Sequence, residues 1–107
     1  MALMQITVVP LGTETASLGE HVADIQRFLK AEGVVCRLHD MGTVIEGEVE
    51  ELLRLAARLH ELPFRRGVMR VLTQIVLDER RDKRVVLGDK VASVAARLGN
   101  ELKTTGK

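Results

Sequence analysis

The apolar residues of this chain follow two periodicities in turn, and the order of these periodicities constrains the fold more than any other feature. From Leu3 to Leu11 they alternate as in a half-buried strand, with Met4, Ile6 and Val8 at the even positions. Beyond Pro10 they recur at helical spacing, at Leu18, Val22, Ile25 and Leu29. The pattern therefore predicts a strand followed by an amphipathic helix.

This first helix carries start and stop signals at its two ends. Ser17 is followed three residues later by Glu20, which is the capping-box pattern of a helix start. Gly33 is the predicted C-terminal cap, because glycine adopts the left-handed conformation that ends many helices. We therefore expect the helix to lie between Ser17 and Gly33.

Two short strands and a second helix are predicted next. Val34 to Asp40 and Thr43 to Gly47 read as strands, and Gly42 marks a tight turn that would join them in a hairpin. Carboxylates enrich the first turn of the following helix, where the helix dipole favours them, at Glu48, Glu50 and Glu51. Pro63 is expected to follow the end of this helix. Its predicted buried stripe is Val49, Leu52, Leu53, Ala56 and Leu59.

The last part of the chain predicts a longer strand and a short helix. Val68 to Asp78 is rich in branched residues and reads as the fourth strand, and Glu79 to Arg84 as a charged loop. Asp89 is expected to cap a final helix that ends at Leu98, with one apolar side formed by Val91, Val94, Ala95 and Leu98. Residues 101–107 are expected to form a flexible tail.

The predicted order is strand, helix, strand, strand, helix, strand, helix. This is the split β-α-β repeat of a ferredoxin-like α+β sandwich with an additional C-terminal helix, and a chain of 107 residues is expected to form it as one domain. Helices cover only one face of such a sheet. The other face would carry nine residues that are half apolar: Leu3, Gln5, Thr7, Val9, Arg70, Leu72, Gln74, Val76 and Asp78. We expect this face to pack against another subunit, unless the extra helix folds over it.

Composition excludes several classes of function. The net charge of +1 gives no reason to expect nucleic acid or an anionic membrane, and the two aromatic residues, Phe28 and Phe64, provide no stacking platform. The single Cys36 excludes an intrachain disulfide and a multi-cysteine zinc site. No apolar run approaches the roughly 20 residues of a membrane-spanning helix. The N-terminus lacks the basic start of a secretory signal, so a cytoplasmic location is expected.

The usual catalytic and metal-binding patterns are also missing from the sequence. His21, His39 and His60 do not have the spacing of metal ligands, and Ser17 and Ser93 are explained by a helix cap and a helix surface. The run from Glu79 to Arg84 reads as a solvated loop, with a phosphate or nucleic-acid contact as the less favoured alternative. We therefore predict neither catalytic residues nor a metal site.

Glu46 is the most unusual charged residue, because it lies inside an apolar strand. It can form a cross-strand ion pair or reach solvent at an edge, or it can act as a ligand-binding carboxylate. As a ligand-binding carboxylate, Glu46 would accept a hydrogen bond from a ring nitrogen, and Thr43 would supply an orienting hydrogen bond. Gly12 and Thr13 lie between a strand and a helix, where backbone amides can hold an anion, although an ordinary connection is favoured.

Four motif blocks resemble the small thiamine-binding-protein family. They are Pro10-x-Gly12-Thr13-x-x-x-Ser17, Met41-Gly42-Thr43-x-Ile45-Glu46-Gly47, His60-x-x-Pro63-Phe64-x-x-Gly67 and Asp78-x-Arg80-x-Asp82. The resemblance covers nearly the whole chain. It implies a ferredoxin-like domain that assembles into dimers or tetramers through its sheets. It also implies binding of thiamine or its hydroxymethylpyrimidine part, without catalysis in most members and with thiamine as ligand rather than cofactor.

The resemblance also implies roles for individual residues. Glu46 would face the aminopyrimidine ring, Thr43 would hydrogen-bond its edge, and Gly42 would belong to the same site. Gly12, Thr13 and Ser17 would border the pocket, and Phe64 would give apolar cover. The missing glycine-rich phosphate loop favours free thiamine over its diphosphate. Two alternatives stay open: a small-molecule metabolic enzyme that uses Glu46 as general base, and an assembly module without a ligand.

Overall fold

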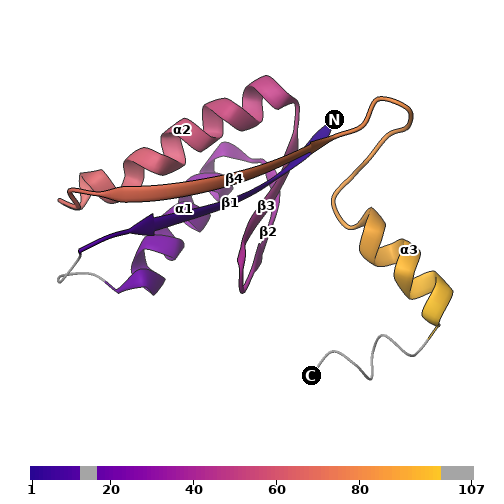
Figure 1. Ribbon diagram of the computed structural model, residues 1–107, viewed down its shortest axis with the longest axis horizontal. Coiled ribbons are helices and arrows are strands. Elements are labelled where there is room, and N and C mark those ends of the chain that lie inside the picture. Colours follow the sequence, from indigo (N-terminus) through magenta and orange to yellow (C-terminus); the bar gives the residue numbers. More distant parts are fainter. Residues whose placement is uncertain (13–16, 100–107) are drawn as a thin grey trace.

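The computed structural model describes residues 1–12 and 17–99. They form β1 (Ala2–Pro10), α1 (Leu18–Glu32), β2 (Val35–His39), β3 (Gly42–Gly47), α2 (Val49–Arg65), β4 (Val71–Glu79) and α3 (Asp89–Leu98). The strands form one antiparallel sheet in the order β2-β3-β1-β4, and α1 and α2 cover one of its faces (Figure 1). This is the ferredoxin-like α+β sandwich with an additional C-terminal helix, so the predicted fold class is confirmed. Thr13 and the expected tail 101–107 lie outside the described residues.

The core lies between the sheet and the two helices. The even-numbered residues of β1 point into it, as their alternation predicts, and Met4 is fully buried. Their partners across the core are Ile45 from β3, Ile25 and Leu29 from α1, and Leu52, Leu55, Ala56 and Leu59 from α2. Burial of these side chains is the main force that holds both helices on the sheet.

Both ends of α1 are formed as the sequence predicts, but its buried stripe is not. The Ser17 hydroxyl accepts a hydrogen bond from the Glu20 N–H at 3.3 Å, and Gly33 adopts φ 71° at the C-terminal end. Leu18, expected in the stripe, is exposed. Its place at the start of the buried face is taken by His21, which is four residues before Ile25 and only 2% exposed.

Two expectations for α2 are wrong. The helix does not end before Pro63 but continues to Arg65, with the proline ring buried. Arg66 N–H then donates to the Pro63 carbonyl at 3.0 Å, a tight turn that ends the helix after the proline. Leu53, expected in the core, is 48% exposed, because it lies about 100° around the helix from Leu52. Leu55 occupies the buried position instead.

The strand boundaries shift by a few residues. Gly42 is the first residue of β3, directly after the two-residue turn at Asp40 and Met41. The fourth strand begins at Val71, because the Val68 N–H is bonded to the Pro63 carbonyl at the end of α2, and it continues through Glu79. Asp89 is not the cap of the last helix: Gly88 takes that place, and the Asp89 carboxylate accepts a hydrogen bond from the Val86 N–H.

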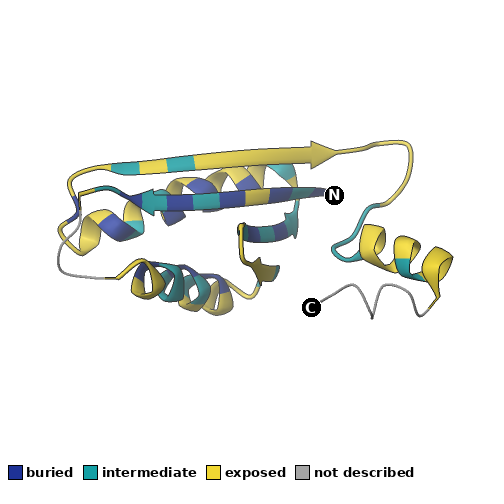
Figure 2. Cartoon of the chain, turned by 60° about the horizontal axis from the view of Figure 1, so that its bottom comes forward, coloured by how far each residue is buried: buried dark blue, intermediate teal, exposed yellow. Residues whose placement is uncertain are grey.

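The second face of the sheet carries the residues that the alternation predicts, except Arg70, which lies before the start of β4. The register pairs Leu3 with Asp78, Gln5 with Val76 and Val9 with Leu72. We call this side the open face. Val76 is 63% and Leu72 51% exposed. Figure 2 shows that most of β4 is exposed.

The additional helix does not cover the open face. Figure 1 shows α3 beside the sandwich rather than on it, and none of its residues is buried. The alternative in which this helix folds over the sheet is therefore wrong for this structure. Within the described ranges 1–12 and 17–99, no helix is long and apolar enough to span a membrane.

Candidate functional site

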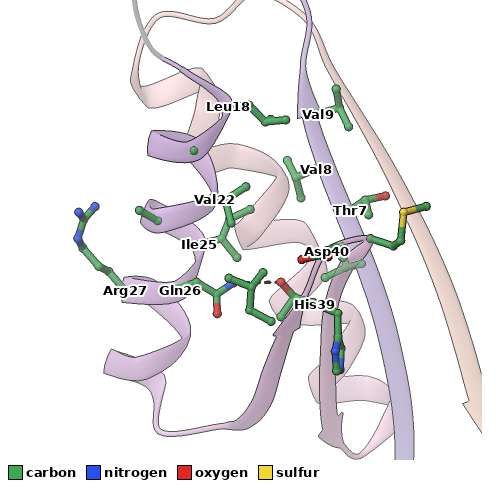
Figure 3. Close-up of a pocket in the computed structure, with 17 residues that line it drawn as sticks. Thr7, Val8, Val9, Leu18, Val22, Ile25, Gln26, Arg27, His39 and Asp40 are labelled. Carbon is green, nitrogen blue, oxygen red and sulfur yellow. Dashed lines mark hydrogen bonds between the residues drawn. The ribbon is translucent and has the colours of Figure 1, made fainter. Parts of the chain in front are cut away.

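A cavity of about 810 Å³ lies between α1 and the tip of the β2–β3 hairpin (Figure 3). We call it the hairpin cavity. Leu18, Val22 and Gln26 line it from α1, and residues 38–43 line it from the hairpin. Its size falls within the range of roughly 300–1,000 Å³ that is typical of small-molecule sites.

The cavity exists because the hairpin is shorter than β1. The β1–β3 ladder ends at the pair Ile6–Thr43, whereas β1 continues to Pro10 and is paired there with β4 alone. Thr7, Val8 and Val9 therefore border the cavity where a longer β3 would have continued the sheet. Backbone amides and carbonyls on an unpaired strand edge are available to a ligand.

Gly42 allows the hairpin to approach β1 closely at this point. Its φ of 151° is a conformation that side-chain-bearing residues rarely adopt. A Cβ atom there would lie 2.9 Å from the Thr7 Cγ2 atom and 3.1 Å from the Ile6 carbonyl oxygen. The glycine therefore shapes one wall of the hairpin cavity by its backbone.

A side-chain hydrogen bond crosses the cavity floor. The Gln26 Nε2 atom donates to the Thr43 Oγ1 atom at 3.0 Å, and Thr43 is only 4% exposed. After this bond, the Gln26 amide keeps one N–H and its carbonyl oxygen, and the Thr43 hydroxyl keeps its own hydrogen. The pair therefore places hydrogen-bond donors and an acceptor side by side among apolar walls.

Charged residues lie at the rim of the hairpin cavity. Asp40 is exposed on the hairpin turn, and His39 precedes it. Arg27 is directed away from the cavity in Figure 3 and forms an ion pair with Asp24 at 3.0 Å. Asp40 is therefore the rim carboxylate that can attract a cation.

Glu46 lies on the other side of the sheet. It is three residues from Thr43 in the same strand, and an odd spacing in a strand places two side chains on opposite faces. Its Oε1 atom accepts a hydrogen bond from the Leu87 N–H at 2.7 Å in a half-buried setting. Among residues 1–12 and 17–99 Glu46 thus has no ion-pair partner, it is half-buried rather than exposed at an edge, and it does not share a site with Thr43.

The other expected site residues are dispersed. Ser17 caps α1 and Gly12 is exposed with φ 70°, and neither lines the hairpin cavity, although Leu18 and Gly19 do. Phe64 lies near the end of α2, where its ring meets His60 edge-on with centroids 5.5 Å apart. It borders neither large cavity. Of the expected residues that the structure describes, only Gly42 and Thr43 line the hairpin cavity.

Sequence reasoning missed Gln26, the polar partner of Thr43. A glutamine on a helix usually faces solvent, so its identity alone gave no reason to single it out. Its spacing did carry a signal, because it lies four residues after Val22 and three before Leu29 in the apolar stripe. A polar residue that flanks a buried stripe is a candidate for a half-buried site.

Two other unusual side chains lie outside the cavity. Among residues 1–12 and 17–99, neither ring nitrogen of the buried His21 has a hydrogen-bond partner. Burial raises the pKa of the half-buried Cys36 thiol, which packs against the hydrophobic core. No group of three His, Cys, Asp or Glu residues in the described part of the chain could hold a metal ion.

Proteins from distant organisms are similar to this chain over nearly its full length. The UPF0045 protein YqgV of Bacillus subtilis is 43% identical over 102 residues, which cover 92% of this chain and 98% of the relative. A UPF0045 protein of Methanothermobacter thermautotrophicus is 37% identical over 99 residues, or 92% of this chain and 100% of the relative.

Solved structures share the fold. Protein MJ1052 from Methanocaldococcus jannaschii is 26% identical with a TM-score of 0.77, covering 88% of this chain and 95% of its own. Protein TM0486 of Thermotoga maritima is provisionally described as a thiamine biosynthesis/salvage protein. It is 22% identical with a TM-score of 0.72, and the match covers 87% of this chain and 97% of its own.

The chain also matches a protein family as a whole. The sequence pattern of the family described as thiamine-binding protein matches residues 4–95. Since this match spans most of the chain and the Bacillus relative is 43% identical, the chain belongs to the thiamine-binding protein family.

Proposed function

We propose that this protein binds thiamine, or its hydroxymethylpyrimidine part, in the hairpin cavity and does not convert it. It would act as a carrier, buffer or sensor of the vitamin. The family description and the provisional description of the Thermotoga maritima neighbour support the ligand class. The observation that carries the proposal is the Gln26–Thr43 hydrogen bond inside a largely apolar cavity of suitable size.

The chemistry of an aminopyrimidine matches this pair. The ring presents a nitrogen acceptor next to an amino donor, and a carboxamide presents a donor next to an acceptor. Glutamine pairs in a comparable bidentate way with adenine, where it contacts the amino group and the neighbouring ring nitrogen N7. Gln26 would therefore hold the ring edge, Thr43 would hold the Gln26 amide in place, and Val22 would pack against the ring.

The rest of thiamine fits the rim. Its thiazolium ring carries a positive charge, and Asp40 is an exposed carboxylate on the hairpin turn. An exposed ion pair of this kind adds only about 1 kcal/mol or less, so it would orient the ligand more than hold it. No cofactor is needed for this function, and Gln26 and Thr43 are neutral groups suited to binding rather than proton transfer.

Titration calorimetry with thiamine and with hydroxymethylpyrimidine tests the proposal. Saturable binding is expected, and Gln26→Leu should weaken it at least about tenfold, because the ring edge would lose two hydrogen bonds. Gln5→Leu is the matched control, since Gln5 is exposed on the open face and should leave the affinity unchanged. The absence of saturable heat with either ligand, or an equal loss of affinity in the two variants, would refute the proposed binding in the hairpin cavity.

We also propose that the protein is a homo-oligomer, a dimer or tetramer, assembled through β4 and the open face. β4 is an edge strand of nine residues with exposed apolar side chains on both of its faces, Leu72 and Val76 on one, Ile75 and Leu77 on the other. A long apolar edge is prone to aggregation unless another strand pairs with it. Antiparallel pairing of β4 with β4 of a second copy is self-complementary, as a twofold interface requires.

A further inference from the structure

A second cavity, of about 740 Å³, lies on the opposite side of the sheet from the hairpin cavity. We call residues 80–88, which follow β4, the strap, and this space the strap cavity. Leu3 and Val44 of the open face line it on one side. Val85, Val86 and Leu87 of the strap and Val91 of α3 add further apolar side chains.

The strap is attached to the sheet by specific contacts. The Glu46 carboxylate accepts the Leu87 N–H at 2.7 Å, which pins the strap across β3. A tight turn follows, in which Val86 N–H donates to the Asp89 carboxylate at 3.0 Å and Asp89 N–H donates to the Val86 carbonyl at 3.1 Å. Gly88 (φ 95°) lies against the Arg37 guanidinium. A Cβ atom added to Gly88 would be 3.4 Å from the Arg37 Nη2 atom. These contacts therefore fix the position of the strap, which forms one wall of the cavity.

Positive charge is concentrated around this cavity. Four cations line it, Arg80, Lys83, Arg84 and Lys90, against two carboxylates, Asp78 and Asp89. Asp89 is engaged by a backbone N–H, and Arg80 pairs with Asp82. In the described ranges, Lys83, Arg84 and Lys90 have no ion-pair partner. The whole chain carries a net charge of only +1, so this excess is local.

We propose that the strap cavity binds a phosphorylated small molecule with an apolar body. Lysine and arginine side chains are the usual protein groups for phosphate, and several on one cavity favour a multiply charged group over a single carboxylate. The apolar floor at Leu3 and Val44 would receive the rest of the molecule. This inference does not rest on the ligand of the hairpin cavity, because the two cavities lie on opposite faces of the sheet.

Phenyl phosphate is a suitable probe, since it combines a phosphate with a flat apolar ring. Titration calorimetry should give saturable binding that weakens as salt rises, because exposed charges are screened. Lys83→Ala/Arg84→Ala should weaken it about tenfold, and Lys30→Ala/Arg65→Ala is the control with the same loss of charge on exposed helix positions. Thiamine binding in the hairpin cavity should be equal in all three proteins.

Two further arms test the two halves of the proposal. Inorganic phosphate should bind more weakly than phenyl phosphate, and equal affinities would overturn the role of the apolar floor. Phenol, which lacks the phosphate, should not compete. The absence of saturable phenyl phosphate binding, or equal weakening by the two double variants, would overturn the proposed site.

Discussion

At the scale of single residues, Gly42 is the glycine, among those that the structure describes, where an added Cβ atom would meet the shortest contacts. Gly42→Ala should lower the free energy of unfolding by about 2 kcal/mol or more, because it adds backbone strain and a contact of 3.1 Å with the Ile6 carbonyl oxygen. Gly12→Ala is the control: its φ is also positive, at 70°, but no atom of the described residues beyond its chain neighbours lies within 4 Å of the added Cβ. Urea unfolding should be measured for both variants. Gly12→Ala reports backbone strain alone, whereas Gly42→Ala reports strain together with the close contact. Equal losses of unfolding free energy would contradict this account.

Asp24 gives a pH-dependent contribution to stability. Its carboxylate accepts a hydrogen bond from Arg66 Nη2 at 3.1 Å, and this bond holds the pKa of Asp24 below its ordinary value. A carboxyl whose pKa is lower in the folded state stabilises the fold above its unfolded pKa, and the effect disappears as pH falls through the folded pKa. Asp24→Asn should therefore cost about 1 kcal/mol or less at neutral pH and nothing in strong acid.

The control for this prediction is Glu61→Gln, which removes an exposed carboxylate that has no ion pair within the described ranges. Denaturant unfolding should be measured for both variants and the parent protein at about pH 7 and at about pH 2. A deficit of Asp24→Asn that stays the same at both pH values would contradict the role of the ion pair with Arg66.

Glu46 illustrates what sequence reasoning could and could not reach. Its position in an apolar strand correctly marked it as a residue in need of a partner. The odd spacing from Thr43 already implied opposite faces, so their separation could have been predicted. Its partner could not, because Leu87 is 41 residues away and offers a backbone N–H that no side-chain pattern reveals.

At the scale of elements, the bond between Glu46 and Leu87 ties the strap to β3. Glu46→Ala should leave the half-buried Leu87 N–H without an acceptor and lower the free energy of unfolding by about 1–3 kcal/mol. Glu46→Gln keeps an oxygen acceptor and should retain most of the stability. Hydrogen exchange at the Leu87 amide is the direct readout: its protection should fall in Glu46→Ala and persist in Glu46→Gln. Equal protection in both variants would mean that the strap is held by other contacts.

The elements that were predicted well are those whose burial follows a simple period. β1 and the end signals of α1 agree with the sequence because alternation and capping act locally. The end of α2 was predicted wrongly because proline is unfavourable inside a helix. Here the burial of the Pro63 ring offsets this cost, and the helix continues past it. The hairpin cavity could not be predicted, since it arises from the different lengths of β1 and β3, and strand ends are set by tertiary packing.

At the scale of the whole molecule, thiamine binding and assembly are proposed for different faces of the sheet. One face holds the core, and the hairpin cavity opens at its margin; the other is half apolar, with β4 at its edge. A ligand in the hairpin cavity would therefore not compete with a second copy on the open face. Assembly and thiamine binding should be separable by mutation, which distinguishes the binding protein from the pure assembly module that the sequence left open.

Val76→Glu provides this separation. Val76 is 63% exposed at the centre of the open face of β4, so the substitution costs little in an isolated chain but buries a carboxylate in an interface formed there. We expect multi-angle light scattering to show a dimer or tetramer for the parent protein and a smaller mass for Val76→Glu, with thiamine affinity unchanged. Leu53→Glu, on the outer side of α2, is the matched control and should keep the parent mass. A monomeric parent protein, or equal masses for all three, would contradict assembly through β4.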